Sequence, residues 1–106
     1  MSLYTCIVQE EGRAAEITDA LEAGLRRIGV DHLGDTEPAS IRWERVPPGF
    51  MFTEGEPSTS SVIIRAVPGD ITLDAREALM RDICDLWTGE TGCTDHEIVV
   101  SVFAGM

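Results

Sequence analysis

The sequence contains no lysine. All eight basic residues among its 106 are arginines, which excludes a Schiff-base lysine and a P-loop lysine. Cysteine is scarce, because Cys6, Cys84 and Cys93 are the only ones. They are odd in number and lack the spacing of a metal site, so we expect reduced thiols, as in the cytoplasm. His32 and His96 lie far apart, with no cysteine at ligand spacing from either, and we predict no metal site.

Long apolar stretches are also absent. No run approaches the roughly 20 apolar residues that a membrane-spanning helix needs. The first residues lack the basic region and the long apolar region of a signal peptide. Acidic residues outnumber basic ones by 19 to 8, a formal net charge of -11, and such a charge repels phosphate backbones and anionic lipids. We therefore predict a cytoplasmic protein with no nucleic-acid or membrane partner.

Four segments have the composition of β-strands. Each is rich in β-branched and apolar residues and is bounded by turn-forming or acidic residues, and they cover 3–9, 40–46, 61–67 and 97–103. Between the second and third strands, residues 50–60 are predicted to form a long loop. We expect its Phe50 and Phe52 to pack onto the sheet or onto a partner subunit.

Apolar residues at helical spacing predict two helices. The first covers 13–28, with Gly29 as its expected stop. The second begins after the N-cap Thr72 and runs to about Trp87. The acidic residues of the first helix are interpreted as a solvated face; they are Glu16, Asp19 and Glu22.

The two halves of the chain repeat. An offset of 58 residues carries the apolar face of the first helix onto that of the second, pairing Ile17 with Ala75, Leu21 with Leu79, Leu25 with Ile83 and Ile28 with Leu86. This indicates a duplicated β-α-β unit, over 3–46 and 61–103, within one domain spanning 1–106.

Two β-α-β units with right-handed crossovers predict an α+β fold. We expect a four-stranded mixed sheet with both helices on one face and the first and third strands adjacent at its centre. The other face needs a cover, and a second subunit is the expected one.

Three strings carry a resemblance to a known family. LYTCIVQE at 3–10, ERVPPGFMFTEGEP at 44–57 and HEIVVSVF at 96–103 resemble the tautomerase superfamily, most closely its cis-3-chloroacrylic acid dehalogenase-like group. The resemblance implies a homotrimer that needs no cofactor, with the active site near the amino-terminal residue. In this family an amino-terminal Pro serves as base or acid, because burial lowers its affinity for a proton.

The residue at the family's Pro position is Ser2. With Met1 retained, the nitrogen of Ser2 is a peptide amide and cannot act as a base. Met1-Ser2-Leu3 is also typical of an expression leader, in which case the natural residue at position 2 would be Pro. The alternative is a protein that naturally lacks Pro there, and the sequence leaves both interpretations open.

Other family positions differ as well. The helical His of the dehalogenases aligns near Leu25, and their Arg-x-x-Arg pair aligns with 68–70, where no Arg is present. Their fourth-strand Tyr aligns with Ser101. Their tail, which carries an acidic catalytic residue, has no counterpart before the last residue, Met106.

Arginines within the predicted strands are the candidate substrate ligands, since the family holds a substrate carboxylate with arginines. Arg65 either forms an ion pair with an acidic residue at a subunit interface or binds the substrate carboxylate in place of the family's arginines. Arg42 and Arg45 lie on opposite faces of the second strand, so at most one faces a shared pocket. We interpret Trp43 and Trp87 as core or interface residues.

The resemblance implies a keto-enol tautomerase or isomerase, or a hydratase-dehalogenase-like enzyme, if the natural amino terminus is Pro. The expected substrate is a small unsaturated or 2-oxo carboxylic acid. The alternative is a catalytically silent homologue that keeps the trimeric fold for binding or regulation.

Overall fold

The structure, a computed structural model, describes residues 3–10, 12–47, 49–57, 62–67 and 71–102, with side chains described outside positions 57, 62 and 65–67. Residues Ser2, Ser61 and Phe103, which figure in the predicted site and strands, lie outside the described residues. No helix in the described part of the chain is long and apolar enough to span a membrane.

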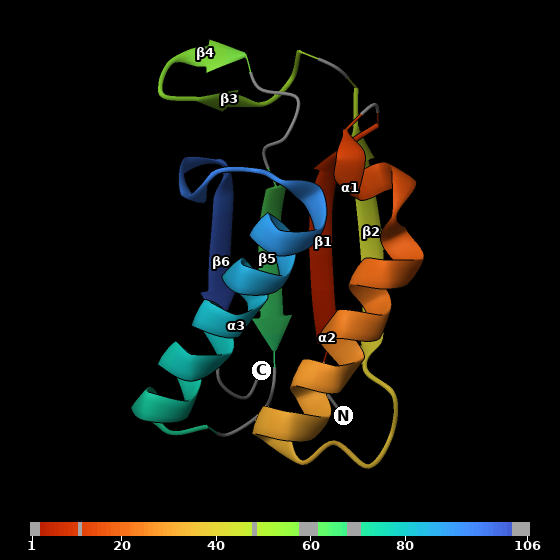
Figure 1. Cartoon of the computed structure of the whole chain (residues 1–106), viewed down its shortest axis with the longest axis vertical. Helices are drawn as coiled ribbons and strands as arrows, with labels where there is room; N and C mark the ends of the chain where they lie inside the picture. Colours follow the sequence, from red (N-terminus) through yellow and green to blue (C-terminus); the bar gives the residue numbers. More distant parts are fainter. Residues whose placement is uncertain (1–2, 11, 48, 58–61, 68–70, 103–106) are drawn as a thin grey trace.

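A four-stranded mixed sheet forms the centre of the fold (Figure 1). Its strands are β1 (Leu3–Gln9), β2 (Ser40–Val46), β5 (Val62–Val67) and β6 (Ile98–Val102), in the order β2-β1-β5-β6. The pairs β1–β2 and β5–β6 are parallel, whereas β1 and β5 are antiparallel. The predicted four-stranded mixed sheet, with the first and third strands adjacent at its centre, is confirmed.

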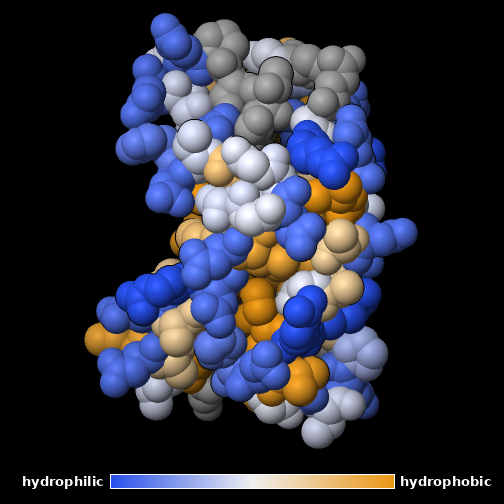
Figure 2. Space-filling model, in the orientation of Figure 1, coloured by the Kyte–Doolittle hydropathy of each residue, from blue (hydrophilic) through white to orange (hydrophobic). Residues whose placement is uncertain are grey.

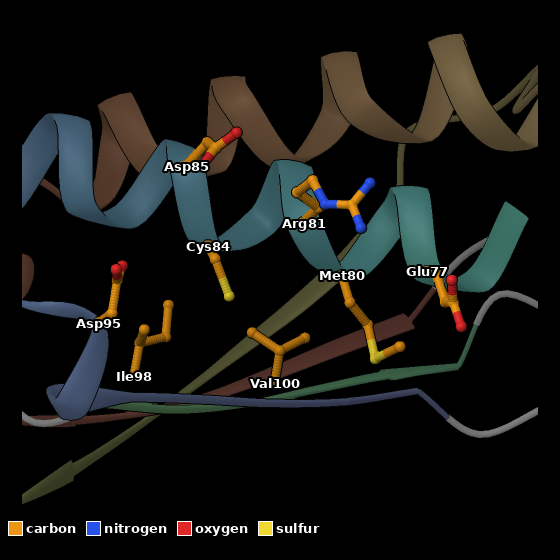
Figure 3. A pocket seen from close by; sticks show the side chains of 8 residues that line it. All are labelled: Glu77, Met80, Arg81, Cys84, Asp85, Asp95, Ile98 and Val100. Atoms are coloured by element: carbon orange, nitrogen blue, oxygen red, sulfur yellow. The ribbon is translucent and has the colours of Figure 1, made fainter. Parts of the chain in front are cut away.

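Two long helices, α2 (Thr18–Leu33) and α3 (Leu73–Thr91), cover the same face of the sheet (Figures 1 and 3). The apolar faces predicted from the repeat form the core, since Leu21, Leu25, Leu79 and Ile83 are fully buried. Alternate β1 residues Tyr4, Cys6 and Val8 meet them from the sheet. On the helix-bearing side, hydrophilic residues cover the outward surfaces, and hydrophobic ones show mainly between the helices (Figure 2).

Both predicted helices end later than expected, and the first one is interrupted. The first helix breaks at Ile17, which separates α1 (Arg13–Glu16) from α2. Gly29 does not stop α2, because Leu33 still packs against the core and the helix continues to it. The stop is Gly34, which adopts the left-handed conformation (φ 63°) that glycine tolerates best.

The second long helix begins as predicted but ends later. Thr72 caps α3 by accepting a hydrogen bond from the amide of Ala75 at 3.2 Å. The helix runs past Trp87 to Thr91 and ends at Gly92, again with positive φ. The fourth strand is preceded by a short 3-10 helix, η1 (Asp95–Glu97), so Glu97 is not part of β6.

The predicted loop at 50–60 contains a small hairpin. Strands β3 (Phe52–Thr53) and β4 (Glu56–Pro57) pair antiparallel and lie beyond one end of the main sheet (Figure 1). Phe50 and Phe52 are exposed, so the prediction that they pack onto this chain's own sheet is wrong. Packing onto a partner subunit stays a prediction.

Candidate active site

Two of the predicted ligand positions, 42 and 65, fall in one row across the sheet. Side chains alternate along a strand, so with Tyr4, Cys6 and Val8 beneath the helices, Thr5 belongs to the open face, opposite the helices. Thr5 pairs with Arg42 of β2 on one side and with Arg65 of β5 on the other. Ser101 of β6 pairs with Arg65 and completes the row. We call these four positions the Thr5 row.

The register places the two arginine positions symmetrically about β1. Neighbouring strands lie about 4.8 Å apart, so the Cα atoms of Arg42 and Arg65 are separated by roughly 10 Å across the strand between them. Arg42 is largely exposed, and its guanidinium forms an ion pair with Glu44 at 3.3 Å. Arg45 pairs with Val8, on the other face of β2. The register thus brings Arg42 and Arg65 together and leaves Arg45 out.

Two family positions can be located from the alignment. Leu25, where the dehalogenases have His, is fully buried in the core, so no side chain at this position reaches the open face. Ser101, at the Tyr position, is half-buried in β6 at the end of the Thr5 row. Residues 68–70, where the Arg pair would be, lie outside the described part of the chain.

One acidic residue was misjudged from the sequence. Glu22 of α2 was interpreted as part of a solvated face, but it accepts a hydrogen bond from the indole nitrogen of Trp43 at 2.6 Å. It also accepts one from Arg26 at 3.5 Å. The ring of Trp43 in turn lies 6.0 Å from that of the fully buried Trp87. Glu22 therefore ties α2 to the edge strand β2.

Two of the cysteines, Cys6 and Cys84, are poorly suited to nucleophilic chemistry. Burial raises the pKa of the Cys6 thiol to about 12, and the negative charge of Glu22 adds to this effect. Burial also raises the pKa of Cys84, with further contributions from Asp85, Asp95 and Cys93. A cysteine nucleophile requires the thiolate, which both environments disfavour. All three cysteines are free.

Both histidines contact carboxylates. The Nε2 of His32 lies 2.5 Å from Oδ2 of Asp82 and links the end of α2 to α3, while His96 lies 3.7 Å from Glu54. In the part of the chain that the structure describes, no group of three or more His, Cys, Asp or Glu side chains could hold a metal ion.

The chain shares its fold with solved structures of the tautomerase type. The resemblance to the tautomerase superfamily is confirmed in the architecture: two parallel β-α-β units joined through antiparallel central strands, with both long helices on one face. No protein-family model matches the chain, and no curated protein matches it.

Solved structures show the likeness directly. The native protein Ps01740 is 25% identical, with a TM-score of 0.79, covering 96% of this chain and 92% of that one. A fused 4-OT solved as an asymmetric trimer is 19% identical, with a TM-score of 0.81 and coverage of 96% and 85%. N1, a member of the cis-3-chloroacrylic acid dehalogenase family, is 14% identical, with a TM-score of 0.83 and coverage of 96% and 73%. The fused 4-OT and N1 are too distant in sequence to show more than a shared fold.

Proposed function

We propose that this protein is a tautomerase-type enzyme that acts on a small unsaturated or 2-oxo carboxylic acid when position 2 is an amino-terminal Pro. Its chemistry would be keto-enol tautomerisation, or hydration and dehalogenation, of which dehalogenation is suggested by the likeness to N1, a member of a dehalogenase family. The observation that carries the proposal is the Thr5 row. It places arginine positions on both strands next to β1, whose first described residue, Leu3, directly follows position 2.

Each group in the proposed site has a physical role. A secondary amine in an apolar pocket loses affinity for its proton and can act as a base near neutral pH. A guanidinium forms strong charge-assisted hydrogen bonds with a carboxylate. Arg42 and Arg65 would hold the substrate carboxylate while the amine at position 2 moves the proton. Arg42 would exchange its ion pair with Glu44 for the substrate.

We also propose that this single domain assembles as a homotrimer. The open face of the sheet exposes the apolar side chains of Leu3, Ile63 and Val99 by 43%, 40% and 56%. The nearby loop exposes Phe50 by 75% and Phe52 by 61%. Exposed apolar surface of this kind is typical of a contact between subunits, and the fused 4-OT of the same fold is a trimer.

We further propose a location in the cytoplasm, with which the three free cysteines are consistent.

The test compares the Ser2 protein with a Ser2→Pro variant, after mass spectrometry has shown whether Met1 is removed. The substrates are phenylpyruvate-type enols, 2-hydroxydienoates and haloacrylates. We expect the Ser2 protein to be nearly inactive. If Met1 is retained, the free amine belongs to Met1 and not to position 2, so it is displaced by a residue from the reacting carbon, and general-base catalysis needs hydrogen-bond reach.

The variant should gain activity towards at least one substrate class. Equal rates for the two proteins would contradict the role of the amine. Inactivity of both towards every substrate would favour the silent homologue. Light scattering that reports a monomer at micromolar concentration would contradict the trimer.

A further inference from the structure

The side chain of Arg76, in the first turn of α3, has no partner among the residues that the structure describes. Its Nε is buried without a hydrogen bond, and its guanidinium group forms no ion pair within the described part of the chain. Arg13, Arg26 and Arg42, by contrast, each contact a carboxylate. A buried donor without a partner is unfavourable, so Arg76 is available to a partner from outside the chain.

The helix itself offers no carboxylate to this arginine. Side chains three and four residues apart meet on the surface of a helix. At those positions around Arg76 there is no acidic residue; they hold Thr72, Leu73, Leu79 and Met80. The chain has 19 acidic residues in all, so a shortage of acids does not explain the missing partner. Arg76 thus keeps its donors free in a strongly acidic protein.

Arg76 lies on the stripe of α3 that faces the sheet. Leu79 and Ile83, three and seven residues further along the helix, share this stripe and are fully buried. Helical side chains lean toward the amino end of their helix, so the guanidinium group of Arg76 extends beneath the start of α3. The residue is only half-buried, and Nε is its one nitrogen that is buried without a partner. Its Nη groups are therefore open to solvent.

The start of α3 lies at the end of the sheet where β1 begins (Figure 1). Leu3, the first described residue of β1, pairs with Val67, the last residue of β5. The chain then returns to form α3, which begins at Leu73. The Thr5 row belongs to the other face of the sheet. Arg76 therefore marks a second cationic position, on the helix side and separate from the Thr5 row.

We propose that Arg76 binds a small aliphatic monocarboxylate beneath the first turn of α3. The Nη groups make the first contact, and a rotation of the flexible side chain lets Nε join. The two carboxylate oxygens then accept hydrogen bonds from Nε and from one Nη group, a geometry that suits a guanidinium. Leu73, which is 62% exposed on the same turn, offers an apolar contact to the aliphatic part of the ligand.

The charge of the protein favours an anion with a single charge. The formal net charge of -11 repels every anion, and it repels one with two or more charges most strongly. This site goes beyond the activity proposed above and does not depend on it.

The experiment titrates the Ser2 protein with propionate at constant ionic strength. Binding is followed by the proton–nitrogen NMR signal of the Arg76 Nε, which reports on the proposed hydrogen bond directly. We expect a saturable shift with propionate and none with propionamide, which has a similar shape but no charge. Inorganic phosphate, with its higher charge, should bind more weakly. The assay requires no catalysis, so its outcome is independent of the amine at position 2.

Matched variants locate the binding, with the amide NMR signal of Leu73 as the readout. Arg76→Gln should weaken propionate binding by about two- to fivefold, the usual contribution of a partly exposed ion pair. Arg76→Lys keeps the charge without the planar fork and should fall between the two. The control is Arg81→Gln, which removes the same charge from an exposed position of α3, between Glu77 and Asp85 (Figure 3). It should leave binding unchanged.

The proposal is overturned if propionate leaves the Nε signal unchanged, if propionamide shifts it equally, or if phosphate binds more tightly than propionate. It is also overturned if Arg81→Gln weakens binding as much as Arg76→Gln. Should Arg76→Gln fail to fold, the Nε signal of the parent protein and the affinity of Arg76→Lys still decide the question.

Discussion

The thiol of Cys6 reports on the packing between the sheet and the helices. Its pKa is raised to about 12 from an ordinary value of 9.0, chiefly by burial. Alkylation requires the thiolate, and a shift of three pH units lowers the thiolate fraction near neutral pH by about a thousandfold. Because Cys6 is also fully buried and the reagent has no direct access to it, we expect iodoacetamide to modify Cys6 orders of magnitude more slowly in the folded protein than in urea.

The same shift makes stability depend on pH. Above pH 9 the unfolded thiol loses its proton while the folded one keeps it until about pH 12. The unfolded state is then favoured, and Cys6 lowers the free energy of unfolding by about 1.4 kcal/mol per pH unit in this window. Urea denaturation at pH 9 and pH 10.5 should show a steeper loss for the parent than for Cys6→Ala, which isolates this group from others that titrate.

Mass spectrometry after timed alkylation distinguishes the three cysteines within one sample. Cys84 is partly exposed and serves as the internal comparison. If Cys6 reacted in the folded protein as fast as Cys84, or if Cys6→Ala had the same pH dependence as the parent, the buried position of β1 beneath the helices would be wrong.

Three further substitutions test individual contacts by urea denaturation. Glu22→Ala should lower the free energy of unfolding by about 1.5 to 3 kcal/mol, because it removes the charged hydrogen-bond acceptor of the Trp43 indole. If neither the stability nor the Trp fluorescence changed, this contact would be contradicted. Thr72→Ala should cost about 1 kcal/mol through loss of the cap of α3, whereas Thr72→Ser should cost less. A double-mutant cycle with His32→Ala and Asp82→Ala should give a coupling of up to about 1 kcal/mol at pH 6, and strict additivity would show that the pair contributes nothing.

The core could be predicted from the sequence because its signal is local. Residues spaced by three and four positions share a helix face, and the repeat placed Leu21 opposite Leu79 in the alignment of the two halves. Both are fully buried, as are Leu25 and Ile83. The end of a helix is harder to predict, because it depends on tertiary packing. Gly29 stays within α2 because Leu33, further along the helix, packs on the core.

The candidate site could be predicted only in part. Arg42 and Arg65 were recognised as candidates, but their common neighbour Thr5 was not. Thr5 and Arg65 are paired by the antiparallel register between β1 and β5. The pattern of residues within either strand does not specify this register. Glu22 was missed for a similar reason, because its donor Trp43 lies 21 residues away on another element.

The central claim is that the Thr5 row forms the carboxylate site of a tautomerase-type enzyme. The most direct measurement is kcat/KM of Arg42→Ala, Arg65→Ala and Arg45→Ala, each in the Ser2→Pro protein. Arg45 lies on the opposite face of β2, so it is the matched control. A hydrogen bond to a charged group is worth about 1.5 to 3 kcal/mol, and we therefore predict a loss of roughly 10- to 100-fold for Arg42→Ala and for Arg65→Ala, and less than about twofold for Arg45→Ala. Equal losses for all three variants, or a loss confined to Arg45→Ala, would contradict the account.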